Sequence, residues 1–181
     1  RFFVLPIADG KINALNSYNI LDTLPELSFD DITRLASHIS GTPVALISLL
    51  DSDRQWFKSK IGLEVEETLR DISFCSHAIL ENDVLVVPDT LEDERFSDNP
   101  LVTGEQKIRF YAGSPLVTVS GEALGTLCVI DRKPRHLTEV QMESLRALTR
   151  QVMDQLELRK HIDKQARYKR KLVEYQKILE E

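Results

Sequence analysis

The sequence is organised around an apolar run, VALISLL, at Val44–Leu50. Seven residues suit a strand better than a helix, and turn-forming residues bound the run at Gly41–Pro43 and Asp51–Asp53. Because nearly every position is apolar, both faces of this strand must be covered by other elements. We therefore expect a central strand in a layered domain.

Composition indicates a globular domain that buries a core. The chain has 181 residues, 42% of them hydrophobic, and a net charge of -6, which gives no global sign of binding to nucleic acid or to an anionic membrane surface. No apolar run reaches the roughly 20 residues of a membrane span. Two cysteines far apart give no disulfide framework. We expect a soluble, cytoplasmic protein and, since the chain lacks an initial Met and ends in a helical pattern, a fragment of a longer one.

Two helices are expected before the central strand. Residues 8–20 carry a weak helical pattern. A stronger helix begins with Ser28 as its N-cap and ends at Gly41, where Pro43 blocks continuation. Its apolar residues at helical spacing should pack on the central strand; they are Phe29, Ile32, Leu35, Ala36 and Ile39.

Four more strands are expected after it. Gln55–Ile61 alternates, which predicts a half-exposed hairpin partner with Phe57 and Ile61 on one face. The opposite face would carry Trp56, Lys58 and Lys60. The remaining expected strands are Val84–Val87, Phe110–Val117 and Leu124–Ile130.

The connections carry their own signals. Leu63–Asp71 is acidic and irregular, and Ser73–Leu80 is typical of a short helix. The charged connection Asp89–Arg109 is long, and long ordered loops tend to be functional lids.

The last element is a long helix. Thr138 and Gln141 have the spacing of a capping box, and the chain from there to Glu181 contains no Pro or Gly. A helix to about Leu179 would be ~60 Å long. Its first apolar stripe is Leu145, Leu148, Val152 and Leu156. A second set, with coiled-coil spacing, is Tyr168, Leu172, Tyr175 and Leu179, and it predicts a parallel homodimer.

The order of these elements and several motifs resemble the GAF family of sensory domains. The motifs are Ile32–Ala36 with Pro43–Leu49, Asp53–Ser59, Ser73–Ile79, Arg109–Leu116 and Leu124–Asp131. The resemblance covers about residues 27–158. It implies an α+β fold with an antiparallel sheet of five or six strands. The terminal helices would pack on one face, and a pocket under the short helix and the long loop would lie on the other.

The resemblance also implies a domain plan and a role. Residues 1–26 would form an N-terminal helical segment, 27–158 the GAF domain, and 159–181 a signalling helix that leads to an output domain in the same chain. In this family the output is often a diguanylate cyclase or a histidine kinase, and neither output motif occurs here. The expected function is a non-enzymatic sensor that binds an unknown small ligand or senses redox state.

A ligand pocket needs a few convergent polar groups on apolar walls. Candidates are Trp56, Phe74, Cys75, His77, Asn99, Arg109 and Tyr111, each of which taken alone is more often a packing or surface residue. The cofactor, if there is one, is unknown. Four scattered histidines lack the spacing of zinc ligands, so no metal site is predicted. The nucleotide signature of cyclic-nucleotide GAF domains is absent as a recognisable set.

The two cysteines leave alternatives open. Cys75 and His77 are close enough for a nucleophile or a bilin attachment point, although related photoreceptors place the histidine directly after the cysteine. A buried, inert Cys75 and a core Cys128 are the commoner arrangement. A thiol-dependent reductase of free methionine sulfoxide is a second function known on this fold, and a dimerising module with a vestigial pocket is a third.

The basic stretch 159–171 holds seven Lys and Arg residues and allows two interpretations. It could contact nucleic acid, or it could be a solvated helical face in a dimer, and the second arrangement is the commoner. We expect no nucleic-acid partner and no membrane segment.

Overall fold

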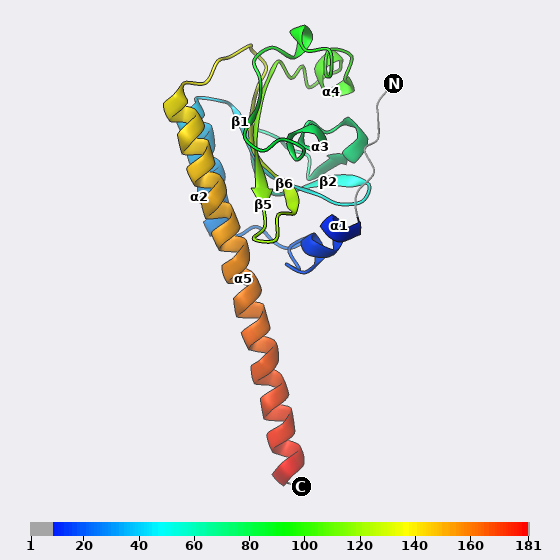
Figure 1. The fold of residues 1–181 in the computed structure, drawn as a ribbon, viewed down its shortest axis with the longest axis vertical. Coiled ribbons are helices and arrows are strands. Elements are labelled where there is room, and N and C mark those ends of the chain that lie inside the picture. The colour runs from blue at the N-terminus through cyan, green and yellow to red at the C-terminus, as the bar shows by residue number, and fades with distance from the viewer. Residues whose placement is uncertain (1–8, 181) are drawn as a thin grey trace.

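The computed structural model describes residues 9–180, so residue 8, where the predicted N-terminal helix begins, lies outside the described residues. Figure 1 shows a curved sheet with a very long C-terminal helix. The helices are α1 (Asp9–Asn16), α2 (Leu27–Ser40), α3 (Cys75–Ala78), α4 (Pro100–Thr103) and α5 (Glu139–Glu180). The strands are β1 (Val44–Leu50), β2 (Arg54–Ile61), β3 (Glu67–Leu69), β4 (Leu85–Val87), β5 (Phe110–Val117) and β6 (Ala123–Asp131). Short 3-10 turns occur at Arg70–Ile72 and Thr90–Glu92.

The strands form one antiparallel sheet in the order β3-β2-β1-β6-β5-β4. The apolar run of β1 lies inside it, paired with β2 and β6, and every residue of β1 is buried. The α+β fold and all five predicted strands are confirmed. The sixth, β3, lies within the segment predicted to be irregular, where pairing with β2 rather than apolar patterning makes the strand.

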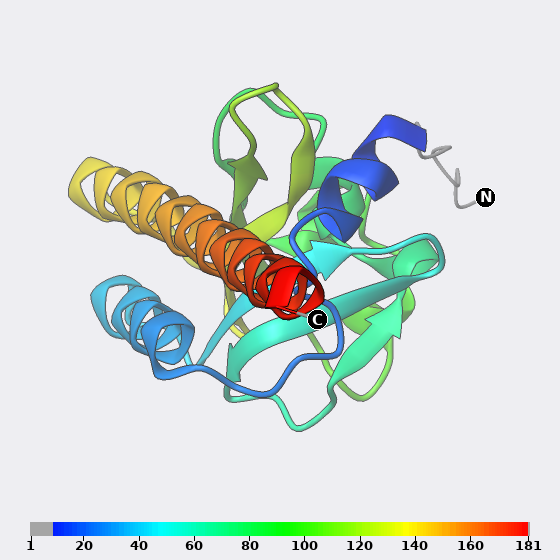
Figure 2. The ribbon, with the colours of Figure 1, turned by 90° about the horizontal axis from the view of Figure 1, so that it is seen from below.

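The helix face of the sheet is the face covered by α2 and α5, which run antiparallel and side by side (Figures 1 and 2). Gln141 Nε2 donates to the Ile39 carbonyl at one end, and Arg159 Nε donates to Glu26 Oε2 at the other. The core on this face includes Ile47, Leu49, Leu127, Val129, Leu145, Val152 and Leu156. Leu15, Tyr18 and Ile20 belong to the same core, so residues 15–20 of the N-terminal segment pack on the domain.

Two predictions for α2 are wrong. Glu26, and not Ser28, is the N-cap residue, and its side chain makes no capping bond. Leu35 and Ile39 are 48% and 37% exposed, because the buried row runs through Phe29, Thr33, Ala36 and Ser40. The prediction counted apolar residues only, whereas the position of α5 also buries small polar ones. Gly41 ends the helix as predicted, with a left-handed φ of 65°.

Strand β2 is mostly buried, and a bulge changes its faces. Ile47 pairs with Ser59 and Ser48 with Phe57, so Lys58 is an extra residue in the strand. Lys58 and Ser59 therefore both point to the helix face, where Lys58 Nζ binds Glu26 Oε2 and Ser59 Oγ donates to Asp30.

The bulge corrects the predicted alternation. Trp56 and Lys58 do share one face, as predicted, and it is the helix face. Beyond the bulge, Lys60 pairs with Leu46 and Ile61 with Ala45, which puts Lys60 on the opposite face and separates Ile61 from Phe57. The prediction of a half-exposed strand is also wrong, since residues 55–59 are all buried.

Helix α5 begins with the predicted capping box. Gln141 N–H donates to Thr138 Oγ1 at 3.2 Å, and Thr138 N–H donates to Gln141 Oε1 at 2.9 Å. Its stripe from Leu145 to Leu156 packs on the sheet, with Leu148 only partly buried. At 42 residues it is about 63 Å long. Its second half extends beyond the domain and is exposed (Figure 1).

Candidate functional site

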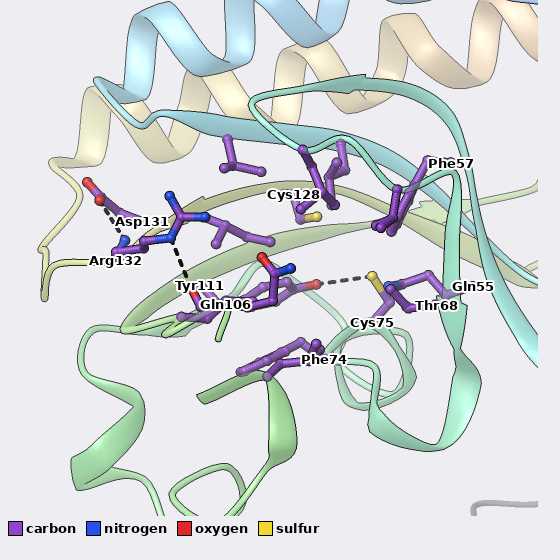
Figure 3. A pocket seen from close by; sticks show the side chains of 17 residues that line it. Gln55, Phe57, Thr68, Phe74, Cys75, Gln106, Tyr111, Cys128, Asp131 and Arg132 are labelled. Atoms are coloured by element: carbon purple, nitrogen blue, oxygen red, sulfur yellow. Dashed lines mark hydrogen bonds between the residues drawn. The ribbon is translucent and has the colours of Figure 1, made fainter. Parts of the chain in front are cut away.

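The cavity face of the sheet, opposite the helix face, encloses a cavity of about 130 Å³ (Figure 3). Strands β1, β2, β5 and β6 form its floor, and the start of α3, α4 and the loops after β2 and α4 form its walls. Its apolar lining is Val44, Leu46, Phe57, Leu63, Val65, Phe74, Leu101, Ile108 and Ile130. Its polar lining is Gln55, Thr68, Cys75, Gln106, Tyr111, Cys128, Asp131 and Arg132.

Aromatic stacking positions the roof. The ring of Phe74 stacks between those of Phe96 and Tyr111, with centroid distances of 4.5 and 5.1 Å. Phe96 belongs to the long loop 89–109, which is ordered and buries this ring completely. The stack therefore ties loop, α3 and β5 together around the cavity.

A thiol cluster lies in the cavity wall. Cys75 Sγ lies 2.8 Å from Thr126 Oγ1, 3.3 Å from Ser48 Oγ and 3.5 Å from Tyr111 Oη. The thiol of Cys128 lines the same cavity. Polar groups from three strands thus converge on one sulfur atom.

These contacts alter the acidity of the cluster. Burial alone would raise the pKa of the Cys75 thiol, but its polar neighbours Cys128, Ser48, Thr126 and Tyr111 outweigh burial and bring it down to about 7. The neighbouring Cys75 thiol and burial raise the pKa of Cys128 well above the ordinary range of a thiol. Burial and the neighbouring thiols likewise raise the pKa of Tyr111. Of the two thiols, Cys75 is therefore the one that ionises first.

Gly113 makes room for this cluster. A Cβ at position 113 would lie 2.2 Å from Tyr111 Oη and 2.8 Å from a carbon of its ring. Gly113 also pairs directly with Cys128 across the β5–β6 ladder. The absence of a side chain at this position lets the Tyr111 hydroxyl reach Cys75.

The two ends of the cavity are polar (Figure 3). At one end Gln55 Nε2 donates to Thr68 Oγ1 at 3.0 Å, while Gln55 Oε1 is buried and has no hydrogen-bond partner among residues 9–180. At the other end Arg132 Nε donates to the Gln106 carbonyl at 2.9 Å, and Asp131 pairs with Arg135. Apolar walls separate these ends, which suits a compact molecule with an apolar body and polar ends.

Three of the seven predicted site residues line the cavity: Phe74, Cys75 and Tyr111. His77 does not. It is half-buried with its ring 4.9 Å from that of Phe96, and burial lowers its pKa. The partner expected for Cys75 from sequence spacing is thus replaced by Cys128, 53 positions away.

The other three predicted site residues also lie outside the cavity lining. Trp56 faces the helix side and packs in that core. Asn99 caps α4 through Leu101 N–H and donates to the Ile72 carbonyl. Arg109 forms an ion pair with Asp89 at 2.9 Å. Their roles in the structure are packing, capping and loop closure.

Sequence reasoning missed Gln55, Thr68, Gln106, Asp131 and Arg132, and it gave Cys128 a core role only. Cys128 could have been found by alternation, because on the fully buried strand β6 it takes the opposite side from Leu127 and Val129. No local signal marks the others, since chain elements distant in sequence bring them together.

Residues 9–180 contain no group of three or more His, Cys, Asp and Glu side chains able to hold a metal ion. In the same part of the chain, no helix combines the length and the apolar character that crossing a membrane requires.

Comparison with known families agrees with this architecture. Residues 25–156 match the model of the GAF domain. The chain belongs to the GAF family. The matched range holds the whole sheet, the cavity and the first part of α5.

This GAF domain is also similar to part of one curated protein. A Pseudomonas aeruginosa protein named cyclic di-GMP phosphodiesterase is 51% identical over 126 residues. The match covers 69% of this chain and 22% of that protein. The chain therefore spans less than a quarter of the length of this relative.

Solved structures share the fold at low sequence identity. The GAF domain of an Acinetobacter phosphoenolpyruvate-protein phosphotransferase has a TM-score of 0.59 at 16% identity, covering 83% of this chain and 95% of that one. The chromophore-binding domain of a bacteriophytochrome from R. palustris has a TM-score of 0.58 at 10% identity, and the match covers 84% of this chain and 62% of that one. A type II free methionine-R-sulfoxide reductase from Thermoplasma acidophilum has a TM-score of 0.54 at 13% identity, and the match covers 74% of this chain and 92% of that one. These likenesses concern the fold alone.

Proposed function

We propose that this GAF domain is the sensory module of a signal-transduction protein, that its cavity binds a small molecule, and that α5 carries the state of the cavity to an output domain. The observation that supports this most directly is that the same two strands border both cavity and helix. Tyr111 and Cys128 face the cavity, while their neighbours Ala112 and Val129 face the core that contains α5. A shift of either strand therefore reaches α5 across one layer of backbone.

The cavity limits the ligand. Pockets for drug-sized ligands usually measure roughly 300–1,000 Å³, whereas this one has about 130 Å³. A cavity of roughly 150 Å³ is known to hold benzene. We infer a ligand of a few heavy atoms with an apolar body, and a cyclic nucleotide would fit only if the roof moved.

Native mass spectrometry of the protein purified from cells tests this ligand. We expect a small adduct that is released on unfolding. Leu63→Trp, which fills the cavity from its wall, should abolish the adduct, and Leu69→Trp, on exposed β3 outside the lining, should keep it. A chain that carries no adduct in any of the three forms would favour the vestigial pocket.

The stretch 159–181, which contains the second half of α5, is proposed as the signalling helix of a parallel homodimer. The residues of its seam are all exposed: Tyr168, Leu172, Tyr175 and Leu179. The same 3-4 spacing continues back through Gln165 and His161 to Leu158, which is also exposed. A solvent-exposed helix of this length is marginal unless it pairs, and a parallel pair delivers both output domains to one place.

Analytical ultracentrifugation tests the seam. Leu172→Asp with Leu179→Asp should shift the chain to monomer, because each charge would be buried in the pair. The matched control is Val173→Asp, which is one position away on a different face of α5 and is also exposed. Equal association of the two variants would remove the seam from the proposal.

For the output, the similarity to a protein named cyclic di-GMP phosphodiesterase favours control of cyclic di-GMP turnover. An output that makes or degrades this nucleotide fits that similarity better than a histidine kinase. Fusing residues 1–181 to such an output and measuring its rate with the wild-type and Leu63→Trp cavities tests this directly. Equal rates with the two cavities would mean that the cavity does not control the output.

A thiol-dependent reductase is the second candidate, favoured by the placement of Cys75 and Cys128 in one cavity. Its test is the conversion of free methionine sulfoxide to methionine with dithiothreitol as the reductant. Catalytic turnover that disappears in Cys75→Ser would support the enzyme, and reaction at the rate of the blank would exclude it.

A further inference from the structure

We propose that Cys75 and Cys128 are an oxidation site of this domain, and that a small hydroperoxide entering the cavity joins them in a disulfide that acts as a second input. The input role rests on the relay through α5 proposed above, whereas the oxidation itself does not. Nothing in the family match or in the similarity to other proteins assigns a role to these two residues.

The first support is the setting of the sulfur atoms. A free cysteine in a core usually behaves as a small apolar group. Here Cys75 Sγ instead contacts hydroxyls of Thr126, Ser48 and Tyr111 and shares the cavity with the thiol of Cys128. Hydroxyls that can donate to the sulfur, such as those of Thr126 and Tyr111, stabilise a thiolate, which is the reactive form, and the polar surroundings bring the pKa of Cys75 to about 7.

The second support is access. Both thiols are only 1% exposed to bulk solvent, yet both line the cavity. Its 130 Å³ has room for hydrogen peroxide or a short alkyl hydroperoxide but not for a tripeptide such as glutathione. The cavity therefore selects small oxidants.

The first chemical step uses Cys75. Its thiolate attacks the terminal oxygen of the hydroperoxide, so that an S–O bond forms and the O–O bond breaks. The leaving alkoxide, or hydroxide when the oxidant is hydrogen peroxide, takes up the proton that Cys75 released and departs as an alcohol or water. Cys75 is then a sulfenic acid.

The second step uses Cys128. The pKa of Cys128 is raised by the neighbouring Cys75 thiol, by burial and by the charge of the Cys75 thiolate, and oxidation of Cys75 removes that charge. Cys128 then loses its proton and attacks the Cys75 sulfur, so that the S–S bond forms and the S–O bond breaks. The hydroxide leaves with that proton as water. Overall, two thiols are oxidised and one hydroperoxide is reduced to an alcohol, or to water, and a further water.

The disulfide changes the cavity roof. A disulfide needs its sulfur atoms about 2.05 Å apart, which is much closer than two sulfur atoms that are not bonded to each other. Cys128 lies in the middle of the sheet, whereas Cys75 begins the four-residue helix α3, so α3 is the element that moves. Phe74, which stacks on Tyr111 in the cavity wall, moves with it.

Intact-mass spectrometry of the whole chain, with hydrogen peroxide as the probe, tests the oxidation. The wild type should lose two hydrogen atoms and regain them with dithiothreitol. Cys128→Ser should stop at a sulfenic acid, read as the gain of one oxygen atom, and Cys75→Ser should react at least about tenfold more slowly. Glutathione disulfide should not modify the folded wild type. A wild type that stays reduced while its urea-unfolded form oxidises, or that forms only disulfides between chains, would overturn the proposal.

Hydrogen exchange separates the oxidation from the relay. If the disulfide forms and exchange changes in both α3 and the first half of α5, the input role is supported. If the disulfide forms and α5 exchanges as before, the input role is overturned. The proposed ligand is judged separately by native mass spectrometry, so failure of the thiol chemistry leaves that result intact.

Discussion

Successive residues of β1 and β6 face opposite sides of one sheet, and the two sides are built differently. On the helix face, Ile47, Leu127 and Val129 pack against apolar side chains of α2 and α5. On the cavity face, Cys128 lines open volume, and Ser48 and Thr126 contact the sulfur of Cys75. Both sides are buried, so burial alone does not separate the supporting side from the side that can bind or react. The separation lies in polarity and unfilled space.

The largest expected effect is on the packed face. Ile47→Ala should lower the free energy of unfolding by about 2–5 kcal/mol, because it empties a filled core. Leu46→Ala, one residue away on the cavity side, should cost less, since part of its surroundings is already empty. Urea unfolding at one fixed protein concentration measures both. Equal costs would mean that the cavity closes in solution.

The buried ion pair at the rim of the helix face should come next. Lys58 has a fully buried side chain and lies 2.6 Å from Glu26, which is 39% exposed. Glu26→Gln leaves the ammonium without its anion and should cost about 1–3 kcal/mol, reduced by the exposure of Glu26. Asp31→Asn, which removes the exposed partner of Arg34, is the matched control and should cost less than about 0.5 kcal/mol. A cost no larger than that of the control would mean that Lys58 is satisfied without Glu26.

The same ion pair predicts that the free energy of unfolding decreases at acid pH. Burial would raise the pKa of Glu26, but the bonds to Lys58 and Arg159 outweigh it and lower the pKa. A lowered carboxyl pKa adds stability that is complete above the unfolded pKa of about 4.3 and is lost as pH falls through the folded value. Glu26→Gln should therefore flatten the loss of stability in that window, as followed by urea unfolding at several pH values. A loss of stability as steep as in the wild type would mean that other carboxyl groups cause the decrease at acid pH.

On the cavity face, a smaller effect is expected, and it concerns the reactivity of the Cys75 thiol. Thr126→Val removes the hydroxyl 2.8 Å from Cys75 Sγ and should slow alkylation by iodoacetamide at pH 7 by about three- to tenfold. The wild-type rate should rise with pH through about 7, where Cys75 ionises, and the variant profile should move to higher pH. Ser114→Ala, whose residue pairs with Leu127 and so faces the helix side, is the control. A similar slowing in this control would indicate a general loss of structure.

The smallest effect is expected at Leu35. Because this side chain is half-exposed on α2, Leu35→Ser should change stability by less than about 0.5 kcal/mol. Thermal unfolding measures it. A large loss, or a change in association state, would show that another surface covers this face of α2 in solution.

The sequence alone predicted the sheet well because apolar runs bounded by turn residues mark most of its strands. The capping box at Thr138 and the left-handed Gly41 could also be predicted, since each depends on residues close together in the sequence. The bulge at Lys58 and strand β3 could not be predicted, because they depend on how distant strands pair. The cavity was the hardest part. Its thiol pair joins α3 to β6, and its polar ends come from four segments, so only the tertiary fold brings them together.

The unbroken α5 has a consequence for how the domain tolerates changes in length. From Glu139 to Glu180 the helix contains no Pro or Gly at which a rotation could be absorbed. Each inserted residue turns everything beyond it by about 100°, so one or two extra residues would point an attached domain in a new direction. Seven extra residues return it to within about 20°. The proposed relay to an output domain therefore predicts that the spacing between the two domains varies in steps of seven residues.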